Sequence, residues 1–483
     1  MISDTFTLSI NGKSEEIRGV SPTTTLLDYL RQQGLTGTKE GCAEGDCGAC
    51  TVALAGRWPS GLPRYEAVNS CLVMLGSVAG REVTSVEGLS PRPGPLHPVQ
   101  EAMVKTGGSQ CGYCTPGFVM SLFAAYYDGG YDGGVGDAAI DTAIEGNLCR
   151  CTGYLAIRRA AAALEEPRED DPFLSRLETV PAAGPLAYEG GGGRFYRPTR
   201  LSEVIELLSE HPEARLVAGG TDLGLEVTRR YRHFPVLIAL EGVEELQRLD
   251  DGKDYFELGA AVTLSHLEAA FRGKIPALDE MLASFAARQI RNRATIGGNL
   301  ATASPIGDLA PVFLSLDAEV RALGPGGERF IPLAAFFTGY RRTALTPAEV
   351  VVSVRIPKAL ARGATRRLSR AYKVAKRPAD DISVVAAAFA LHLDAEDRVV
   401  RARLAYGGVA ATPVRARGVE EALKGKRWDA AAVREVKGLL EEAFTPLTDP
   451  RGSAGYRRLL IGNLFEKFLF EPSRSLTESG VGA

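Results

Sequence analysis

The placement of cysteine is the feature that most constrains this chain. All eight cysteines lie between Cys42 and Cys151, and the rest of the 483 residues contain none. The first residues alternate polar and apolar side chains, which is not the pattern of an export signal. A dense, uneven cysteine set in such a chain favours metal ligation over disulfide bonds.

The first four cysteines follow the spacing C-x4-C-x2-C, with the fourth further along. They are Cys42, Cys47, Cys50 and Cys71. This is the spacing of plant-type ferredoxins, in which four thiolates hold a [2Fe–2S] cluster. We expect Gly41, Gly45 and Gly48 to supply positive φ and to let backbone N–H groups face the sulfurs. Zinc or unliganded thiols are the alternatives, although zinc sites favour short paired C-x2-C motifs.

The second four cysteines read C-x2-C and then C-x-C. They are Cys111, Cys114, Cys149 and Cys151. Alone, this set fits a [2Fe–2S] cluster, a zinc site with four cysteine ligands, or a redox dithiol at Cys111 and Cys114. Because it follows the first set and leaves no cysteine over, we favour a second [2Fe–2S] cluster. All eight cysteines are then iron ligands.

The pattern along the chain predicts a multidomain α+β protein. Residues 1–84 show two strands joined at Asn11-Gly12, a helix over Thr25–Gln33 and a cysteine loop before strand Thr51–Ala55, which suits a β-grasp ferredoxin domain. Residues 85–164 are helical, and Thr115-Pro116 is typical of an N-cap followed by proline. Residues 165–193 have the composition of a linker and include four consecutive glycines.

The second half is mixed α/β and contains two glycine turns that suit a long phosphorylated ligand. Strand Arg215–Ala218 runs into Gly219-Gly220, where backbone N–H groups can face a phosphate. The turn lacks the G-x-G-x-x-G pattern of a nicotinamide site. A second turn, Gly297-Gly298-Asn299, lies in a segment with hydroxyl and carboxylate groups at Thr302, Ser304 and Asp308. Taken alone, either turn is more often an ordinary loop.

Several of these motifs together resemble the molybdenum hydroxylase family, which includes xanthine dehydrogenases, aldehyde oxidases and carbon monoxide dehydrogenases. The matching motifs are GCAEGDCGAC (Gly41–Cys50), QCGYCTPG (Gln110–Gly117), EGNLCRCTGY (Glu145–Tyr154), TIGGNLATASPIGDLAP (Thr295–Pro311) and AYKVAKRPADDISVV (Ala371–Val385). The resemblance covers nearly the whole chain. It implies a vanillyl-alcohol-oxidase-like FAD-binding domain over 194–365, a C-terminal α+β flavoprotein domain over 366–470 and a tail over 471–483.

The resemblance also implies individual roles. Gln110 would approach the molybdenum cofactor, and Asp380 and Asp381 would border a nicotinamide entrance. Lys373 would place a cation near the flavin, which stabilises the anionic reduced ring. The FAD contacts would be Leu216, Val217, Ala218, Gly219, Gly220, Thr221, Asp222, Leu223, Phe285, Thr295, Gly298, Asn299, Thr302, Ser304, Asp308, Val351 and Lys373.

The organisation resembles the small subunit of a bacterial xanthine dehydrogenase. This implies that electrons pass from a molybdenum cofactor on a larger partner subunit, through the two clusters, to FAD and then NAD⁺, while hypoxanthine or xanthine is oxidised to urate. A heterotetramer of two heterodimers is implied, and no residue here need act as a catalytic acid or base. The alternatives are the redox subunit of a hydroxylase for aldehydes or N-heterocycles, and a zinc-stabilised assembly protein.

The composition of the chain limits the cellular location and the binding partners that we expect. A net charge of −3 argues against nucleic acid as the main partner. No apolar window approaches the ~18 residues of a membrane helix. Together with the absence of an export signal, this predicts a cytoplasmic protein that does not enter membranes.

Overall fold

A computed structural model describes residues 2–57, 63–90, 93–128, 137–180 and 183–471. The chain forms two compact units, each built from two stretches of sequence. Unit 1 comprises Met1–Glu244 and Ala286–Ala294, and unit 2 comprises Glu245–Phe285 and Thr295–Ala483. The predicted tail beyond residue 471 lies outside the described residues. The fold is multidomain α+β, as the sequence predicts.

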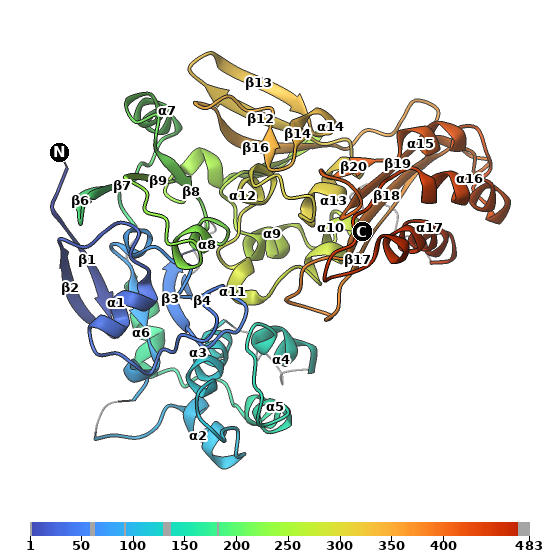
Figure 1. Ribbon diagram of the computed structural model, residues 1–483. Coiled ribbons are helices and arrows are strands. Elements are labelled where there is room, and N and C mark those ends of the chain that lie inside the picture. The colour runs from blue at the N-terminus through green and yellow to red at the C-terminus, as the bar shows by residue number, and fades with distance from the viewer. Residues whose placement is uncertain (1, 58–62, 91–92, 129–136, 181–182, 472–483) are drawn as a thin grey trace. The chain divides into compact units, whose positions relative to one another are not determined.

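The N-terminal part of unit 1 is a five-stranded mixed sheet in the order β2-β1-β5-β3-β4. Strands β1 to β4 are labelled in Figure 1. Its elements are β1 (Thr5–Ile10), β2 (Lys13–Arg18), α1 (Leu26–Gln32), β3 (Thr51–Arg57), β4 (Pro63–Asn69) and β5 (Glu82–Thr84). The Thr25 hydroxyl caps α1 by accepting from the Asp28 amide, and Leu26, Leu27 and Leu30 are buried. This is the predicted strand–strand–helix–loop–strand order, with the cysteine loop between α1 and β3.

Four helices form the next part of unit 1: α2 (Pro98–Lys105), α3 (Thr115–Tyr126), α4 (Asp137–Ile144) and α5 (Leu155–Ala162). Helix α3 is buried on nearly all sides, which fits its continuous apolar sequence. Its N-cap is Cys114, so Thr115 is the first helical residue rather than the predicted cap. The start of this helix therefore coincides with a cysteine of the second set.

The segment predicted as a linker contains regular structure. Helix α6 (Pro172–Glu178) is capped by Asp171, and β6 (Leu186–Gly190) pairs with β7 (Gly193–Arg197). Gly191 and Gly192 have φ of 56° and 83°, so the glycine run makes a tight hairpin rather than a loose connection. The remaining elements of unit 1 are α7 (Leu201–Glu210), β8 (Arg215–Val217), α8 (Leu223–Thr228), β9 (Val236–Ala239) and α11 (Arg288–Arg291).

Unit 2 begins with a five-stranded sheet in the order β10-β11-β16-β12-β13. Its strands are β10 (Leu249–Asp251), β11 (Tyr255–Gly259), β12 (Glu319–Gly324), β13 (Gly327–Pro332) and β16 (Val350–Pro357). The other elements of this part are α9 (Leu264–Phe271), α10 (Pro276–Leu282), α12 (Ile296–Ala301), α13 (Leu309–Ser315), α14 (Leu333–Phe336), β14 (Phe337–Gly339) and β15 (Arg342–Thr343). Helix α10 does not continue into Arg288, because Ala286 has φ of 47° and the chain turns there.

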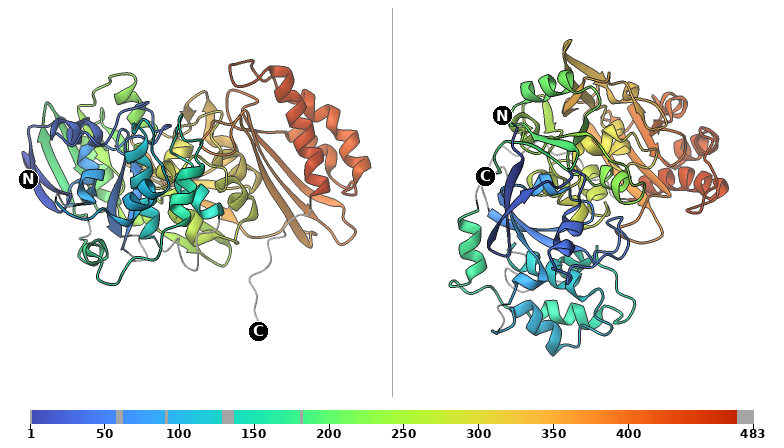
Figure 2. Two further views of the ribbon diagram at one scale, coloured as in Figure 1. Left: turned by 90° about the horizontal axis from the view of Figure 1, so that it is seen from below. Right: turned by 60° about the vertical axis from the view of Figure 1, so that its left-hand side comes forward.

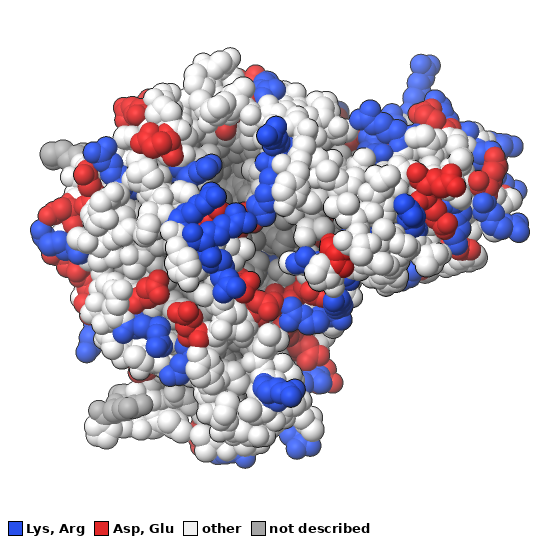
Figure 3. All heavy atoms as spheres, viewed as in Figure 1, with Lys and Arg blue, Asp and Glu red and all other residues white. Residues whose placement is uncertain are grey.

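The C-terminal part of unit 2 is an antiparallel sheet, β17-β18-β19-β20, with three helices packed on one face (Figure 2). Its elements are β17 (Arg366–Val374), β18 (Val385–Leu393), β19 (Val399–Gly407), β20 (Val414–Arg415), α15 (Arg417–Leu423), α16 (Ala430–Glu442) and α17 (Ala454–Phe470). Strand β18 is buried throughout, so it reads as a continuous apolar run. Charges of both signs are interspersed over this part of the surface (Figure 3). Lys437 of α16 pairs with Glu466 of α17.

A buried histidine makes unit 1 sensitive to acid. The His97 ring nitrogen Nε2 lies 2.9 Å from the Tyr127 hydroxyl, which donates to Asp171 at 2.8 Å. Burial lowers the pKa of His97 to about 4, and the Asp171 carboxylate only partly opposes this. His97 is therefore neutral in the folded protein, while in the unfolded chain it binds a proton near the ordinary value of about 6.5.

We expect the stability of unit 1 to fall as the pH drops from 7 to 5. The unfolded chain binds more protons in this window, so stability is present above about pH 6.5 and is lost toward pH 4. His97 alone should account for about 2 kcal/mol between pH 7 and pH 5. Thermal unfolding of wild type and His97→Gln across this range measures the difference. Parallel pH profiles would contradict the assignment.

Candidate functional site

The first cysteine loop is held by its own backbone and by polar side chains around it. The Cys42 sulfur accepts from the Glu44 amide at 3.3 Å. Asn69, two residues before Cys71, donates its side-chain amide to the Gly45 carbonyl at 2.6 Å. The Thr228 hydroxyl donates to the Ala43 carbonyl at 2.7 Å. These bonds keep the loop folded over its four cysteines.

The thiols of the first set approach one another in pairs. A hydrogen bond from Cys47 lowers the pKa of the Cys42 thiol to about 5, and backbone amides add to this effect. A hydrogen bond from Cys71 lowers the pKa of the Cys50 thiol in the same way. The pKa values of the two donors, Cys47 and Cys71, are raised. Backbone N–H groups face the sulfurs of this set, as predicted. Among the described residues, no three His, Cys, Asp or Glu side chains are placed to hold a single metal ion.

The glycines of this loop act in two different ways. Gly45 and Gly48 have φ of 77° and 66°, as predicted, but Gly41 does not have positive φ. A Cβ at Gly41 would lie 2.7 Å from the Cys47 sulfur, so this position requires glycine for space. Ala43 has φ of 56°, which the sequence gives no reason to expect.

The second set lies at the surface of the helical part. Cys111 and Cys151 are exposed, whereas Cys114 and Cys149 are partly buried. The Cys149 sulfur lies 3.1 Å from the Thr152 hydroxyl and accepts from the Thr152 amide at 3.4 Å. Burial raises the pKa of Cys114 to about 12, with Cys149 as its hydrogen-bond partner. The predicted cofactor-facing residue Gln110 is exposed beside Cys111.

The first glycine turn belongs to unit 1. It follows β8, and Leu223 begins α8 directly after Thr221 and Asp222. Gly220 has φ of 80°, and a Cβ at Gly219 would lie 1.7 Å from the Arg293 carbonyl oxygen. The turn therefore requires both glycines. The predicted contacts Leu216, Val217 and Ala218 form the strand end that leads into it.

The second glycine turn belongs to unit 2 and forms the start of α12. The Thr295 hydroxyl caps this helix by accepting from the Gly298 amide at 3.1 Å, and the Thr302 hydroxyl donates to the Gly298 carbonyl. Ser304 accepts from the Ile306 amide at 3.3 Å. These hydroxyls therefore also shape the turn. The Asn299 Oδ1 atom is different, because it is buried without a hydrogen-bond partner among the described residues.

Three predicted flavin residues do come together in unit 2. The Lys373 ammonium lies 2.8 Å from Asp308 Oδ2 and 5.9 Å from the centre of the Phe285 ring. Both charged side chains are at least nine-tenths buried. Ser383, which the sequence gives no reason to select, donates to Asp308 Oδ1 at 2.5 Å. Val351 is buried in β16, and no contact between it and this group is described.

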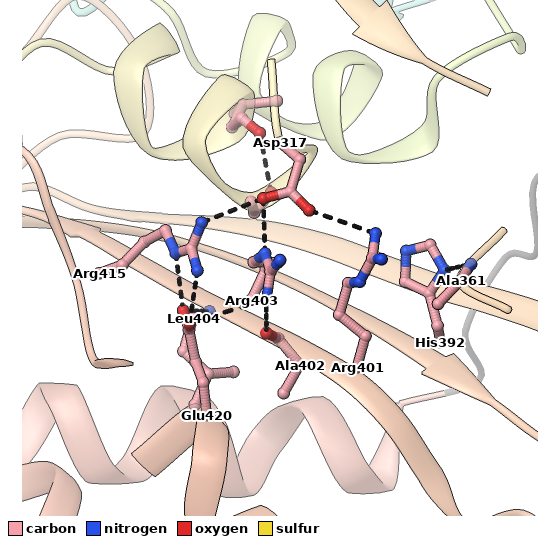
Figure 4. A network of polar contacts seen from close by, with 11 residues as sticks. Asp317, Ala361, His392, Arg401, Ala402, Arg403, Leu404, Arg415 and Glu420 are labelled. Atoms are coloured by element: carbon pink, nitrogen blue, oxygen red, sulfur yellow. Dashed lines mark hydrogen bonds and ion pairs between the residues drawn. The ribbon is translucent and has the colours of Figure 1, made fainter. Parts of the chain in front are cut away.

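Helix α13 is held at both ends by charged residues of the C-terminal sheet. Asp308 is its N-cap, paired with Lys373 of β17. Asp317, just beyond its other end, accepts from Arg403 at 2.5 Å and Arg415 at 3.0 Å (Figure 4). Arg415 also pairs with Glu420, whose carboxylate accepts from the Leu404 amide. Polar contacts to the C-terminal sheet thus hold the helix that carries Asp308.

The residues present fit an extended polar cofactor in the flavin region. Asn299 Oδ1 needs a donor that the described residues do not provide. The Lys373 ammonium has three donors, and its described hydrogen bond, to Asp308, uses one. In the same unit, a Cβ at Gly297 would lie 2.6 Å from the Ala260 side chain, so the turn that starts α12 requires glycine there.

Comparison with protein families matches nearly the whole chain. Residues 8–75 match the 2Fe-2S iron-sulfur cluster binding domain, and residues 85–162 match the [2Fe-2S] binding domain. Residues 188–359 match the FAD binding domain in molybdopterin dehydrogenase. Residues 370–471 match the CO dehydrogenase flavoprotein C-terminal domain. The chain belongs to the molybdenum hydroxylase family. Iron–sulfur and FAD-binding domains are thus established, as predicted, while the individual ligands remain predictions.

Curated relatives of this molybdenum hydroxylase chain are xanthine dehydrogenases. It is 36% identical to xanthine dehydrogenase of Emericella nidulans, over 96% of this chain and 38% of the relative. It is 34% identical to xanthine dehydrogenase 2 of Arabidopsis thaliana, over 92% of this chain and 38% of the relative. The chain thus spans about two-fifths of the length of these relatives.

Several solved structures resemble part of the chain. A Cu,Mo-CO dehydrogenase chain is 27% identical with a TM-score of 0.53, over 56% of this chain and 94% of that one. A chain of quinoline 2-oxidoreductase from Pseudomonas putida 86 is 28% identical with a TM-score of 0.52, at the same coverage. None of the helices in the described residues is both long and apolar enough to span a membrane.

Proposed function

We propose that this chain is the electron-transfer part of a xanthine dehydrogenase. Electrons would pass from a molybdenum cofactor on a partner subunit, through two [2Fe–2S] clusters, to FAD and then NAD⁺, as hypoxanthine or xanthine becomes urate. The observation that carries the proposal is the gathering of two four-cysteine sets in one unit, with their loops hydrogen-bonded to each other. The similarity to xanthine dehydrogenases supports the substrate.

The proposal gives each group of residues a role. Cys42, Cys47, Cys50 and Cys71 would hold one cluster, and Cys111, Cys114, Cys149 and Cys151 the other. Asn299 and Lys373 would bind FAD, and Asp308 would orient the Lys373 ammonium through their hydrogen bond. Bound FAD would supply the change from single electrons to hydride that iron–sulfur clusters cannot perform. Gln110 would face the molybdenum cofactor of the partner, within a heterotetramer.

Purification of the native complex tests the proposal. We expect a coloured protein with iron, acid-labile sulfide and FAD, and xanthine-dependent reduction of NAD⁺ faster than that of oxygen. A colourless chain with zinc and no flavin would overturn it in favour of an assembly protein. A molybdenum-replete complex without xanthine turnover would favour a hydroxylase for another substrate, which the likeness to quinoline 2-oxidoreductase makes the second candidate.

The NAD⁺ step can be tested at Asp380 and Asp381. Asp381 accepts from the amides of Lys376, Arg377 and Ile382, and these bonds outweigh burial and lower its pKa. We expect Asp380→Asn and Asp381→Asn to weaken the NAD⁺ reaction several-fold and leave dye reduction by xanthine unchanged. Asp394→Asn is the control, because Asp394 also caps a loop by accepting from backbone amides. Unchanged NAD⁺ kinetics would remove the role.

A further inference from the structure

A short segment from the flavin half of the sequence is built into unit 1. Ala286–Ala294 lies between Phe285 and Thr295, both predicted flavin contacts, yet it packs with the iron–sulfur part. Its residue Ile290 packs against the small buried cluster that contains Cys50 and Cys71. Its residue Gln289 is 1% exposed and reaches the second cysteine loop. The segment therefore contacts both cysteine sets.

The two cysteine loops touch through their backbones. The Leu148 amide, adjacent to Cys149, donates to the carbonyl of Cys47 at 3.0 Å. A Cβ at Gly48 would lie 2.1 Å from the Gly146 carbonyl oxygen, and one at Gly117 would lie 2.2 Å from the Gly48 carbonyl oxygen. The loops could not approach this closely with larger residues. The Cys47–Leu148 hydrogen bond thus joins a cysteine of the first set to the residue that precedes Cys149 of the second set.

Buried side-chain amides hold this contact. Asn147 donates to the Gly48 carbonyl at 3.0 Å and accepts from the Ser121 hydroxyl at 2.7 Å. Gln289 donates to Asn147 Oδ1 and to Ser121 Oγ, both at 2.9 Å. Asn147 is 2% exposed, so no water competes for these bonds. Its side chain therefore has one orientation, set by α3 and by the inserted segment.

We propose that the Asn147–Gln289 network positions the two cysteine loops by fixing the distance between them. The network thereby maintains the Cys47–Leu148 hydrogen bond, which is the electronic connection between the two loops. This rests on the proposed function, because it requires a cluster in each set. Electronic coupling falls steeply with distance and is stronger across covalent and hydrogen bonds than across empty space. One electron passes from the second site, which is oxidised, to the first, which is reduced, and no bond or proton changes.

The variant Asn147→Leu in the full chain tests the network. Leucine keeps the size and the backbone amides but cannot donate to the Gly48 carbonyl. We expect both reduced clusters to keep their own EPR signals, with a weaker magnetic interaction between them. Transfer of an electron from the second cluster to the first after pulse reduction should slow roughly tenfold, the lower end of the effect of losing an outer partner at a metal site.

Asn292→Leu is the matched control. Asn292 is equally buried in the same segment, and its side-chain amide donates to the Ala67 carbonyl of β4 at 2.8 Å. It should leave the magnetic interaction and the transfer rate unchanged. Equal values for wild type and Asn147→Leu, with both clusters present, would overturn the proposal.

A second variant decides the case if Asn147→Leu loses a cluster. Gln289→Met removes both donated bonds, but Ser121 still donates to Asn147, so both clusters should load. A weaker magnetic interaction and a slower transfer in Gln289→Met, both changed less than in Asn147→Leu, support the network. A magnetic interaction and a transfer rate equal to those of the wild type overturn the proposal. Failure of the cluster assignment on which this inference rests is distinguishable, because the wild-type chain would then contain no iron–sulfur clusters.

Discussion

Replacement of Cys47 by serine is expected to remove the first cluster and leave the second. Cys47 lies in the middle of the first loop, where its thiol is the hydrogen-bond partner of Cys42. Four thiolates are needed to hold two irons, and serine is a poor ligand for them. We expect about half of the iron and one of two EPR signals to disappear, with the flavin absorbance retained.

The reciprocal variant is Cys111→Ser, which should remove the other signal. Cys111 is exposed, so its loss leaves no cavity in the core. Together the two variants assign each signal to a cysteine set. Retention of both signals in Cys47→Ser would contradict the ligand assignment, and zinc in place of iron in all samples would support the assembly-protein alternative.

The sequence predicts the cysteine sets well because their signal is local. The spacing from Cys42 to Cys50 and the glycines between them describe a single loop, whose geometry depends little on the rest of the chain. The β-grasp part is predicted for the same reason, since the Asn11-Gly12 turn and the cap at Thr25 act over a few residues. The fold class and the family domains can therefore be predicted from short, local segments of the sequence.

Long-range partners are not readable in this way. Nothing around Gln289 indicates that it contacts Asn147, because 142 positions separate them. The same holds for Ser383 with Asp308 and for Arg415 with Asp317. The region from 165 to 193 was misleading for a different reason: its glycines resemble a flexible linker, but tertiary contacts use them in a hairpin. Whether a glycine-rich segment is ordered, and which distant side chains meet, depends on which residues are buried. A single sequence does not show which residues these are.

Replacement of Lys373 by methionine is expected to have the largest effect on unit 2. The Lys373 and Asp308 side chains are 4% and 9% exposed, so removal of the ammonium leaves a buried carboxylate without its cation. Breaking a buried pair in this way costs about 3–5 kcal/mol. Urea unfolding should show this loss of stability, and the purified protein should contain little FAD. Lys358→Met is the control, because the Lys358–Asp251 pair is more exposed and is worth at most about 1 kcal/mol.

The double variant Lys373→Met with Asp308→Asn separates stability from cofactor binding. Without the carboxylate no uncompensated charge remains, and the amide oxygen of asparagine can still accept from Ser383. Most of the lost stability should therefore return. FAD should not return, because the cation proposed for the flavin is still absent. Recovery of both stability and FAD would mean that the pair only supports helix α13, and that Lys373 has no direct role in holding the cofactor.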